Sequence, residues 1–320
     1  MFARLIAKGI VLNAKRPGPA LCAALAAGLS LAIGVAAPAH ARFPFSHAKP
    51  AAADPAVAEA VARDIDRALQ ERRLADAGAL LEQAAGAGMK TPRITELTGE
   101  LLLARARYAD ALDTFHKVEA DEALRARVMQ GEGIALSLMG RSDDALAALT
   151  RSTSQDPSLW RAWNALGKEY DLRRDWVHAD QAYTAALGAP SANAAVVLNN
   201  RGYSRLLQGK KDEASQDFVA ALEKDPSLAA ARTNLRLALA LKGDYARAAA
   251  AGVGEDRAVV LNNVGLAAAL RGDFAESENL LGQAMAARGQ YYGRASSNLE
   301  LAHSLELKAN PRAEEPHDGH

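Results

Sequence analysis

The chain has 320 residues, of which 49% are hydrophobic and 5% aromatic, and its formal net charge at pH 7 is zero. This balance argues against a protein built mainly to bind nucleic acid or anionic lipid. The length allows one large domain or two of ordinary size, and the abundance of alanine favours helix.

Residues 1–41 have the pattern of a secretory signal. Four basic residues and no acidic one precede an apolar run over 20–37, and Ala39-His40-Ala41 matches an A-x-A cleavage site. We expect cleavage there and a periplasmic protein of a Gram-negative bacterium. Since the apolar run approaches the length of a membrane span, an uncleaved membrane anchor is the alternative. Lipidation at Cys22, the only cysteine, is not expected, because a lipoprotein signal needs a small residue where Leu21 stands.

Residues 42–57 are rich in Ala and Pro and predict a disordered linker. After it, a period of about 34 residues sets in, which is typical of stacked helix pairs that cannot bury their apolar faces alone. We predict a solenoid over residues 58–308. The alanines that mark the period are Ala77, Ala111, Ala145, Ala179, Ala214 and Ala248, and the predicted pairs start near Ala58, Pro92, Ala126, Trp160, Ala195, Ala229 and Ala258.

The pair that starts at Trp160 carries a specific motif. Trp163, Leu166, Gly167 and Tyr170 have the spacing W-x2-L-G-x2-Y. This motif resembles the tetratricopeptide repeat (TPR) family, and the resemblance implies an all-α superhelical solenoid of antiparallel helix pairs.

Small residues alternate with large ones in these pairs. Gly167 and Gly202 fall where the two helices of a pair approach most closely, and a side chain there would hold them apart. Trp163, Tyr183 and Phe218 are predicted to fill the space that the small residues leave.

Glycine also marks the turn inside most pairs, where it permits the left-handed residue that ends a helix. Gly140, Gly209, Gly243 and Gly272 occupy this place, whereas Arg174 occupies it in its own pair. That pair either uses a different turn or accepts strain at Arg174.

The sixth pair, from Ala229, is truncated, because residues 248–256 are too short and too rich in glycine for a full second helix. This irregularity is either ordinary decay of the repeat or a device that changes the curvature and opens a local groove. Residues 292–308 are predicted to form a capping helix, and residues 309–320 a disordered tail.

The residue types that catalysis needs do not form a constellation. Of the seven histidines, His116, His178 and His303 lie on separate predicted helices, without the i, i+4 spacing of a helical metal site. We therefore expect a protein that is not an enzyme and that has no cofactor, no metal site and no catalytic residue.

What remains is a surface for peptide binding. In TPR arrays the first helix of each pair lines the concave face, where carboxamides can donate to and accept from the main chain of an extended peptide. Alternatively, these asparagines bond between neighbouring repeats. The predicted contact residues are Asn164, Lys168, Asn199, Asn200, Tyr203, Asn234, Asn262 and Asn263.

Four cations lie near the same repeats: Arg161, Lys168, Arg201 and Arg205. They either attract an acidic or C-terminal carboxylate group of a partner or form a solvated face.

The runs 234–246 and 261–266, together with the signal, resemble the TadD family of TPR proteins from the tight-adherence (Flp) pilus assembly system. The resemblance implies a periplasmic adaptor whose partners are proteins of the pilus or secretion machinery, the secretin among them. It also implies an association with the outer membrane through partners, and the zero net charge predicts that nucleic acid is not among the partners. A general periplasmic scaffold or chaperone for envelope biogenesis is the alternative.

Overall fold

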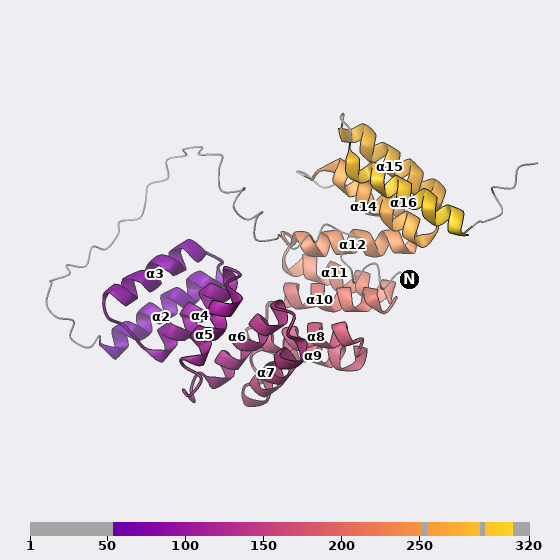
Figure 1. Ribbon diagram of the computed structural model, residues 1–320. Helices are drawn as coiled ribbons and strands as arrows, with labels where there is room; N and C mark the ends of the chain where they lie inside the picture. The colour runs from indigo at the N-terminus through magenta and orange to yellow at the C-terminus, as the bar shows by residue number, and fades with distance from the viewer. Residues whose placement is uncertain (1–53, 251–254, 289–291, 310–320) are drawn as a thin grey trace, which may run out of the picture. The chain divides into compact units, whose positions relative to one another are not determined.

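The computed structural model describes residues 54–250, 255–288 and 292–309. The predicted signal and the predicted tail beyond Ala309 lie outside these ranges. The described residues form fifteen helices and no strand, which confirms the all-α prediction (Figure 1). The helices are α2 (Pro55–Gln70), α3 (Leu74–Gly86), α4 (Pro92–Ala104), α5 (Tyr108–His116), α6 (Arg125–Leu138), α7 (Ser142–Gln155), α8 (Trp160–Arg173), α9 (Trp176–Gly188), α10 (Ala194–Leu207), α11 (Lys211–Lys224), α12 (Ala229–Lys242), α13 (Tyr245–Ala248), α14 (Arg257–Arg271), α15 (Phe274–Arg288) and α16 (Gly293–Ala309).

The first helix begins earlier than the predicted linker allows. Helix α2 starts at Pro55, inside the stretch 42–57, because Asp54 caps it with a side-chain oxygen that accepts from the Ala56 N–H. Proline at the first helical position loses no hydrogen bond, since that N–H has no partner within a helix. The Asp-Pro pair is thus a helix start, which a composition argument does not detect.

The turn inside each helix pair has the same backbone conformation throughout the described chain. The predicted glycines Gly140, Gly209, Gly243 and Gly272 all have positive φ, between 79° and 98°. Arg174 has φ 58°, so its pair keeps the common turn and accepts the strain of a left-handed side-chain residue. Arg72 and Ala106 also have positive φ, and they occupy the equivalent place in the first two pairs.

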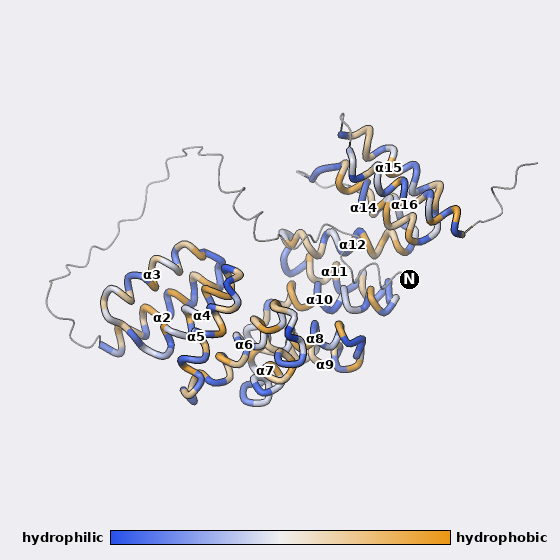
Figure 2. The backbone as a smooth tube through the Cα atoms, in the orientation of Figure 1, coloured by the Kyte–Doolittle hydropathy of each residue, from blue (hydrophilic) through white to orange (hydrophobic). Residues whose placement is uncertain are grey.

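The chain divides within α8 into two units, which comprise the described residues 54–165 and 166–309. In the N-terminal unit the first helices α2, α4 and α6 pack side by side, and α3 and α5 pack against the first helix of the following pair. In the C-terminal unit α10, α12, α14 and α16 form the corresponding layer of first helices. Hydrophilic and hydrophobic residues alternate along most helices, as a two-layer stack requires (Figure 2).

Large apolar rings fill the space beside the glycines of the first helices. Tyr183 and Phe218 are 1% and 0% exposed. A Cβ atom on Gly167 would lie 2.6 Å from the Tyr183 ring, and one on Gly202 would lie 2.7 Å from the Phe218 ring. The predicted close approach at these glycines is therefore correct.

Trp163 is an exception to the predicted packing. It is half-buried and does not belong to the core, and its indole Nε1–H donates to the Pro157 carbonyl at 3.0 Å. The indole covers the turn that leads into α8 instead of filling the space between paired helices.

The sixth pair is truncated, since its second helix, α13, has only four residues. The described chain ends its stack with α16, which packs against both α14 and α15 and buries Ala295 and Ala302. The capping helix of the predicted fold is therefore present. Within the described residues, no helix combines the length and the apolar composition that crossing a bilayer requires.

Candidate protein-binding face

The predicted asparagines of the C-terminal unit lie on its layer of first helices. Asn199 is on α10, Asn234 on α12, and Asn262 and Asn263 on α14. The Asn234 amide donates to Asn199 Oδ1 at 3.0 Å, which joins the first helices of successive pairs. A residue that was not predicted, Asn298 of α16, donates in the same way to Asn262 Oδ1 at 2.9 Å.

The asparagines were predicted either to contact a peptide or to bond between neighbouring repeats. For some of them these bonds decide the question. Asn262 is 1% exposed, so its side chain lies between repeats and not on the surface as predicted. Its amide donates to Asn263 Oδ1 at 3.1 Å, as the amide of Asn199 donates to Asn200 Oδ1 at 3.2 Å. Asn199, Asn200, Asn234 and Asn263 are half-buried and keep some contact with solvent.

The remaining predicted residues are more scattered. Tyr203 is half-buried and packs against the core cluster of the C-terminal unit, and this burial raises the pKa of its hydroxyl. Lys168 is exposed. Asn164 is half-buried and belongs to the N-terminal unit. The structure therefore brings together the asparagines of α10 and α12, and separately those of α14 and α16.

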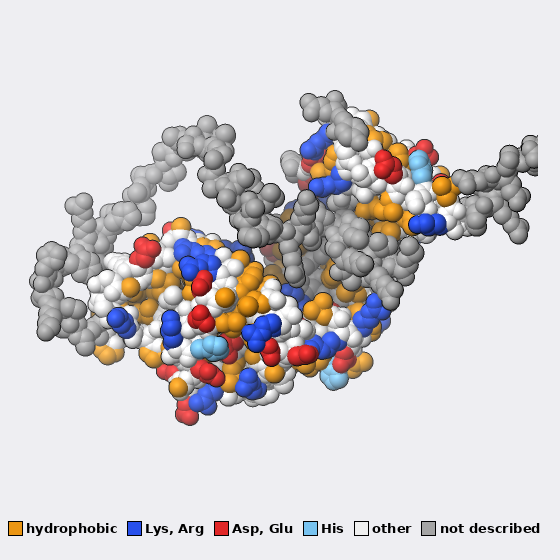
Figure 3. All heavy atoms as spheres, in the orientation of Figure 1, with side chains coloured by type: hydrophobic (Ala, Val, Ile, Leu, Met, Phe, Trp, Pro, Cys, Tyr) orange, Lys and Arg blue, Asp and Glu red, His pale blue; other side chains and the backbone are white. Residues whose placement is uncertain are grey.

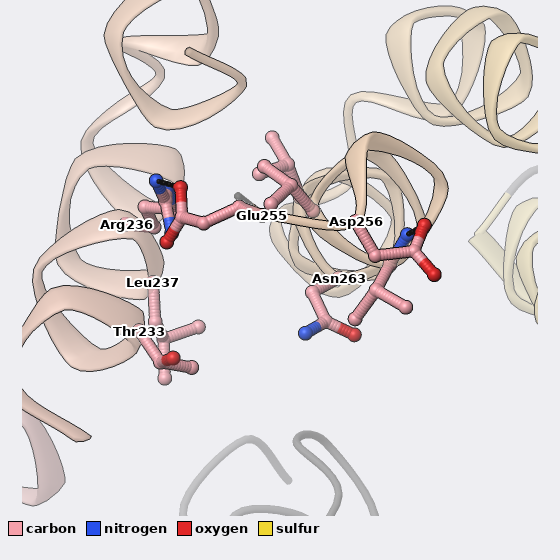
Figure 4. Close-up of a pocket in the computed structure, with 9 residues that line it drawn as sticks. Thr233, Arg236, Leu237, Glu255, Asp256 and Asn263 are labelled. Atoms are coloured by element: carbon pink, nitrogen blue, oxygen red, sulfur yellow. Dashed lines mark hydrogen bonds and ion pairs between the residues drawn. The ribbon is translucent and has the colours of Figure 1, made fainter. Parts of the chain in front are cut away.

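A cavity lies between α12 and α14 (Figure 4). Its volume is about 200 Å³. Because α13 is so short, Asn262 follows Asn234 by less than a full period, and no bond joins these two among the described contacts. Most of the surface area that lines the cavity is apolar. The lining residues are Thr233, Arg236, Leu237, Glu255, Asp256, Val259, Val260, Asn263 and Val264.

An ion pair holds one wall of the cavity. Arg236 of α12 binds both carboxylate oxygens of Glu255, and its Nη2 donates to the Ala250 carbonyl at 3.0 Å. Arg232 Nε lies 3.2 Å from Glu255 Oε1. On the other side Asp256 caps α14, and its side chain accepts from the N–H groups of Ala258 and Val259. These contacts fix the start of α14 relative to α12.

Solved structures of other proteins share this arrangement of helices. A chain of the APC/C hetero-tetramer Cut9-Hcn1 superposes with a TM-score of 0.57 and 16% identity, over 74% of this chain and 48% of that one. TTC0263, a thermophilic TPR protein in Thermus thermophilus, superposes with a TM-score of 0.50 and 18% identity, over 57% of this chain and 98% of that one. The fold is that of a TPR solenoid.

The sequence comparison is more limited. The probable UDP-N-acetylglucosamine–peptide N-acetylglucosaminyltransferase SPINDLY of Hordeum vulgare is 31% identical over 141 residues, which are 42% of this chain. The match spans only 15% of the length of that protein. No protein-family model matches the chain. The comparisons therefore establish the solenoid fold of this chain.

Of the four predicted cations, only Lys168 is exposed. The three arginines form neither a clamp for a carboxylate of a partner nor a solvated face. Arg161 binds Glu100 at 2.9 Å in the N-terminal unit. In the C-terminal unit Arg201 and Arg205 both bind Asp217, which is 4% exposed, at 2.7 Å and 2.8 Å. The three arginines thus neutralise buried carboxylates inside the protein.

A second charge network, which was not predicted, lies on the first helices of the N-terminal unit. Arg93 of α4 binds Asp66 of α2 at 2.6 Å and also pairs with Glu96, and Arg127 of α6 donates to Glu96 at 3.2 Å. Glu96 is fully buried, and this burial raises its pKa. Arg93, Arg127 and Arg161 occupy the same place in three successive pairs, a signal that is visible in the sequence. On the face in view, acidic and basic side chains are interspersed accordingly (Figure 3).

Proposed function

We propose that this protein is a non-enzymatic TPR adaptor, and that it binds an extended segment of a partner protein at the cavity between α12 and α14. The observation that carries the proposal is the break between α12 and α14 in the asparagine bonds that join successive first helices. Between α10 and α12, and between α14 and α16, carboxamides bond to one another across neighbouring repeats. Between α12 and α14 no such bond joins Asn234 to Asn262 among the described contacts, and a cavity lies between these two helices.

The chemistry of the lining defines the segment that fits. Leu237, Val260 and Val264 are buried and offer an apolar floor for an aliphatic side chain of the partner. Thr233 and Asn263 line the same cavity with groups that donate and accept hydrogen bonds. One aliphatic anchor flanked by main-chain hydrogen bonds gives specificity for a short extended peptide.

The setting that we propose is the periplasm, and the process is the assembly or localisation of a Tad/Flp-type pilus or secretion complex. The signal pattern of residues 1–41 and the TadD-like runs 234–246 and 261–266 support it. Those two runs include Leu237, Asn263 and Val264, so the part that resembles TadD contributes to the cavity. A general periplasmic scaffold for envelope biogenesis would use the same cavity with another partner.

The binding site is tested by a charge placed at the cavity rim. Val259 lines the cavity and is half-buried, so Val259→Lys puts an ammonium group there without removing a core residue. The control is Val177→Lys on α9, where the side chain is 66% exposed. We expect crosslinked capture of the partner from the native envelope to fall for V259K and to persist for V177K. Equal capture by both variants would show that the partner binds elsewhere.

The process is tested separately in the cell. Deletion of the gene should abolish surface pili and leave pilin synthesis intact, and V177K but not V259K should restore piliation. Normal piliation in the deletion strain would refute the pilus role and would leave the adaptor site to be assigned to another envelope complex.

A further inference from the structure

Three potential metal ligands lie together in the N-terminal unit, whereas the cavity described above belongs to the C-terminal unit. His116 is the last residue of α5, Glu119 follows it in the turn, and Glu132 is on α6. One ligand atom from each residue lies within 4.8 Å of the other two. The spacing of histidines along the sequence does not reveal this group, because its third member comes from the next helix.

The state of Glu132 indicates that this group is more than a surface cluster. Glu132 is 7% exposed, and its Oε1 is buried and accepts no hydrogen bond from any described residue. A buried carboxylate oxygen without a partner is costly, so such atoms call for a cation or a donor. The nearest basic atom is His116 Nε2, 3.6 Å from Oε1. Arg151 also attracts the carboxylate, but it makes no ion pair with it within 4.0 Å among the described contacts.

We propose that His116, Glu119 and Glu132 bind a divalent transition metal ion of the zinc class. One imidazole nitrogen and two carboxylate oxygens form a donor set that suits Zn²⁺ and its neighbours in the first transition row. Ca²⁺ would require six or more oxygen ligands, which this group does not supply.

His116 and Glu132 already lie close to the separation that two ligands of one ion require. Two ligands at about 2.0–2.1 Å from a tetrahedral ion lie roughly 3.3 Å apart. The 3.6 Å between His116 Nε2 and Glu132 Oε1 is close to that distance. The side chain of His116 is 60% exposed and Glu119 is exposed, so both are able to rotate toward the fixed carboxylate of Glu132.

Metal binding would connect α5 to α6 through the irregular turn between them. Helix α5 has nine residues and is the shortest of the described second helices apart from α13. An ion that bridges the end of α5, the turn and α6 binds only the folded form, so it raises the stability of the N-terminal unit by mass action.

The test uses the untagged full chain and Zn²⁺ in competition with a chromophoric chelator. We expect one equivalent of Zn²⁺ whose affinity falls at least tenfold in His116→Ala and in the isosteric Glu132→Gln, and a thermal midpoint that Zn²⁺ raises only in the parent chain. Arg151→Gln should tighten binding, because it removes a competing cation. His178→Ala is the matched control, since His178 pairs with Asp175 at 2.6 Å and no third metal ligand from the described residues joins them.

Zinc held by the other histidines would be unaffected by H116A, so the variants separate this site from the rest of the chain. Equal stoichiometry and affinity in the parent, H116A and E132Q would overturn the proposal. His116 is exposed, so H116A remains a valid test even if E132Q fails to fold.

Discussion

Phe115 packs between two glycines. This packing predicts whether a glycine-to-alanine substitution beside the ring lowers or raises the free energy of unfolding. The ring is 0% exposed. On one side a Cβ atom at Gly99 would lie 2.5 Å from Cε1, and on the other side a Cβ at Gly131 would contact Cζ, Cε2 and Cε1 at less than 3.0 Å. The ring is therefore held from both neighbouring first helices, α4 and α6, and it cannot move away from either one.

Two opposing effects determine the result of Gly131→Ala. Alanine favours a helix interior over glycine by about 1 kcal/mol. Overpacking of a filled core costs roughly 1–3 kcal/mol. Because the Phe115 ring has no free space, we expect the second effect to dominate and the free energy of unfolding to fall by about 1–2 kcal/mol. In a Phe115→Leu background the obstructing ring atoms are absent, so the same Gly131→Ala change should stabilise by about 1 kcal/mol.

The four variants of this cycle can be compared by urea denaturation followed by far-ultraviolet circular dichroism, with fits that allow each repeat its own stability. Gly282→Ala in α15 is the control, because a Cβ there would have no heavy atom within 4 Å and the alanine should stabilise the helix. If Gly131→Ala stabilised the parent chain as much as Gly282→Ala does, the claim that small residues set the approach of α4, α5 and α6 would be refuted.

Left-handed strain, a half-buried acid and a half-buried indole give three further predictions. Ala106→Gly and Arg174→Gly should each stabilise the chain by about 0.5–1 kcal/mol in urea denaturation, because they remove left-handed strain; a loss of stability would contradict the observed φ of 59° and 58°. Burial raises the pKa of Asp171 to about 6, so the folded protein favours the protonated acid and loses about 3 kcal/mol of stability as the pH rises from about 4 to about 6. Asp171→Asn should remove that loss in a pH series of thermal melts, and an unchanged pH profile would exclude Asp171 as its source. Trp163→Phe should cost about 0.5–1.5 kcal/mol through the lost bond to Pro157, whereas a cost of about 3–5 kcal/mol in the same melts would indicate a fully buried core residue.

The fold was predictable because its decisive contacts are local and repeat. The Ala and Gly positions of a pair are small for the same steric reason in every copy, so their recurrence along the chain reveals the pairs. The turns at Arg72 and Ala106 could not be recognised by residue type, since neither is a glycine. Their distance from Gly140 in whole periods would have located them.

The candidate site was harder to predict, because the role of a polar residue depends on the spacing between helices. Asn199 and Asn262 stand at the same place in the repeat, yet Asn262 is buried and Asn199 is half-buried. Asn298 was missed because it lies on the capping helix, where the predicted pattern ends. Arg201 and Arg205 were expected at the surface, but whether a cation finds a buried partner such as Asp217 depends on packing that a single sequence does not specify.

Polar side chains of regular repeats satisfy one another across neighbouring first helices, which is why we propose the irregular repeat as the place where a partner binds. When two first helices follow each other by the full period, equivalent polar residues meet, as Asn199 and Asn234 do at 3.0 Å, and each satisfies the hydrogen bonds of the other. The shorter step between Asn234 and Asn262 removes that match, and the same two helices, α12 and α14, enclose a cavity whose lining surface is mostly apolar. Ordinary decay of a repeat would leave a gap with unpaired polar groups, which is costly when buried. Here Arg236, Glu255 and Asp256 hold the rim through paired contacts, so the short repeat is a stabilised feature, which favours the interpretation that it opens a binding groove.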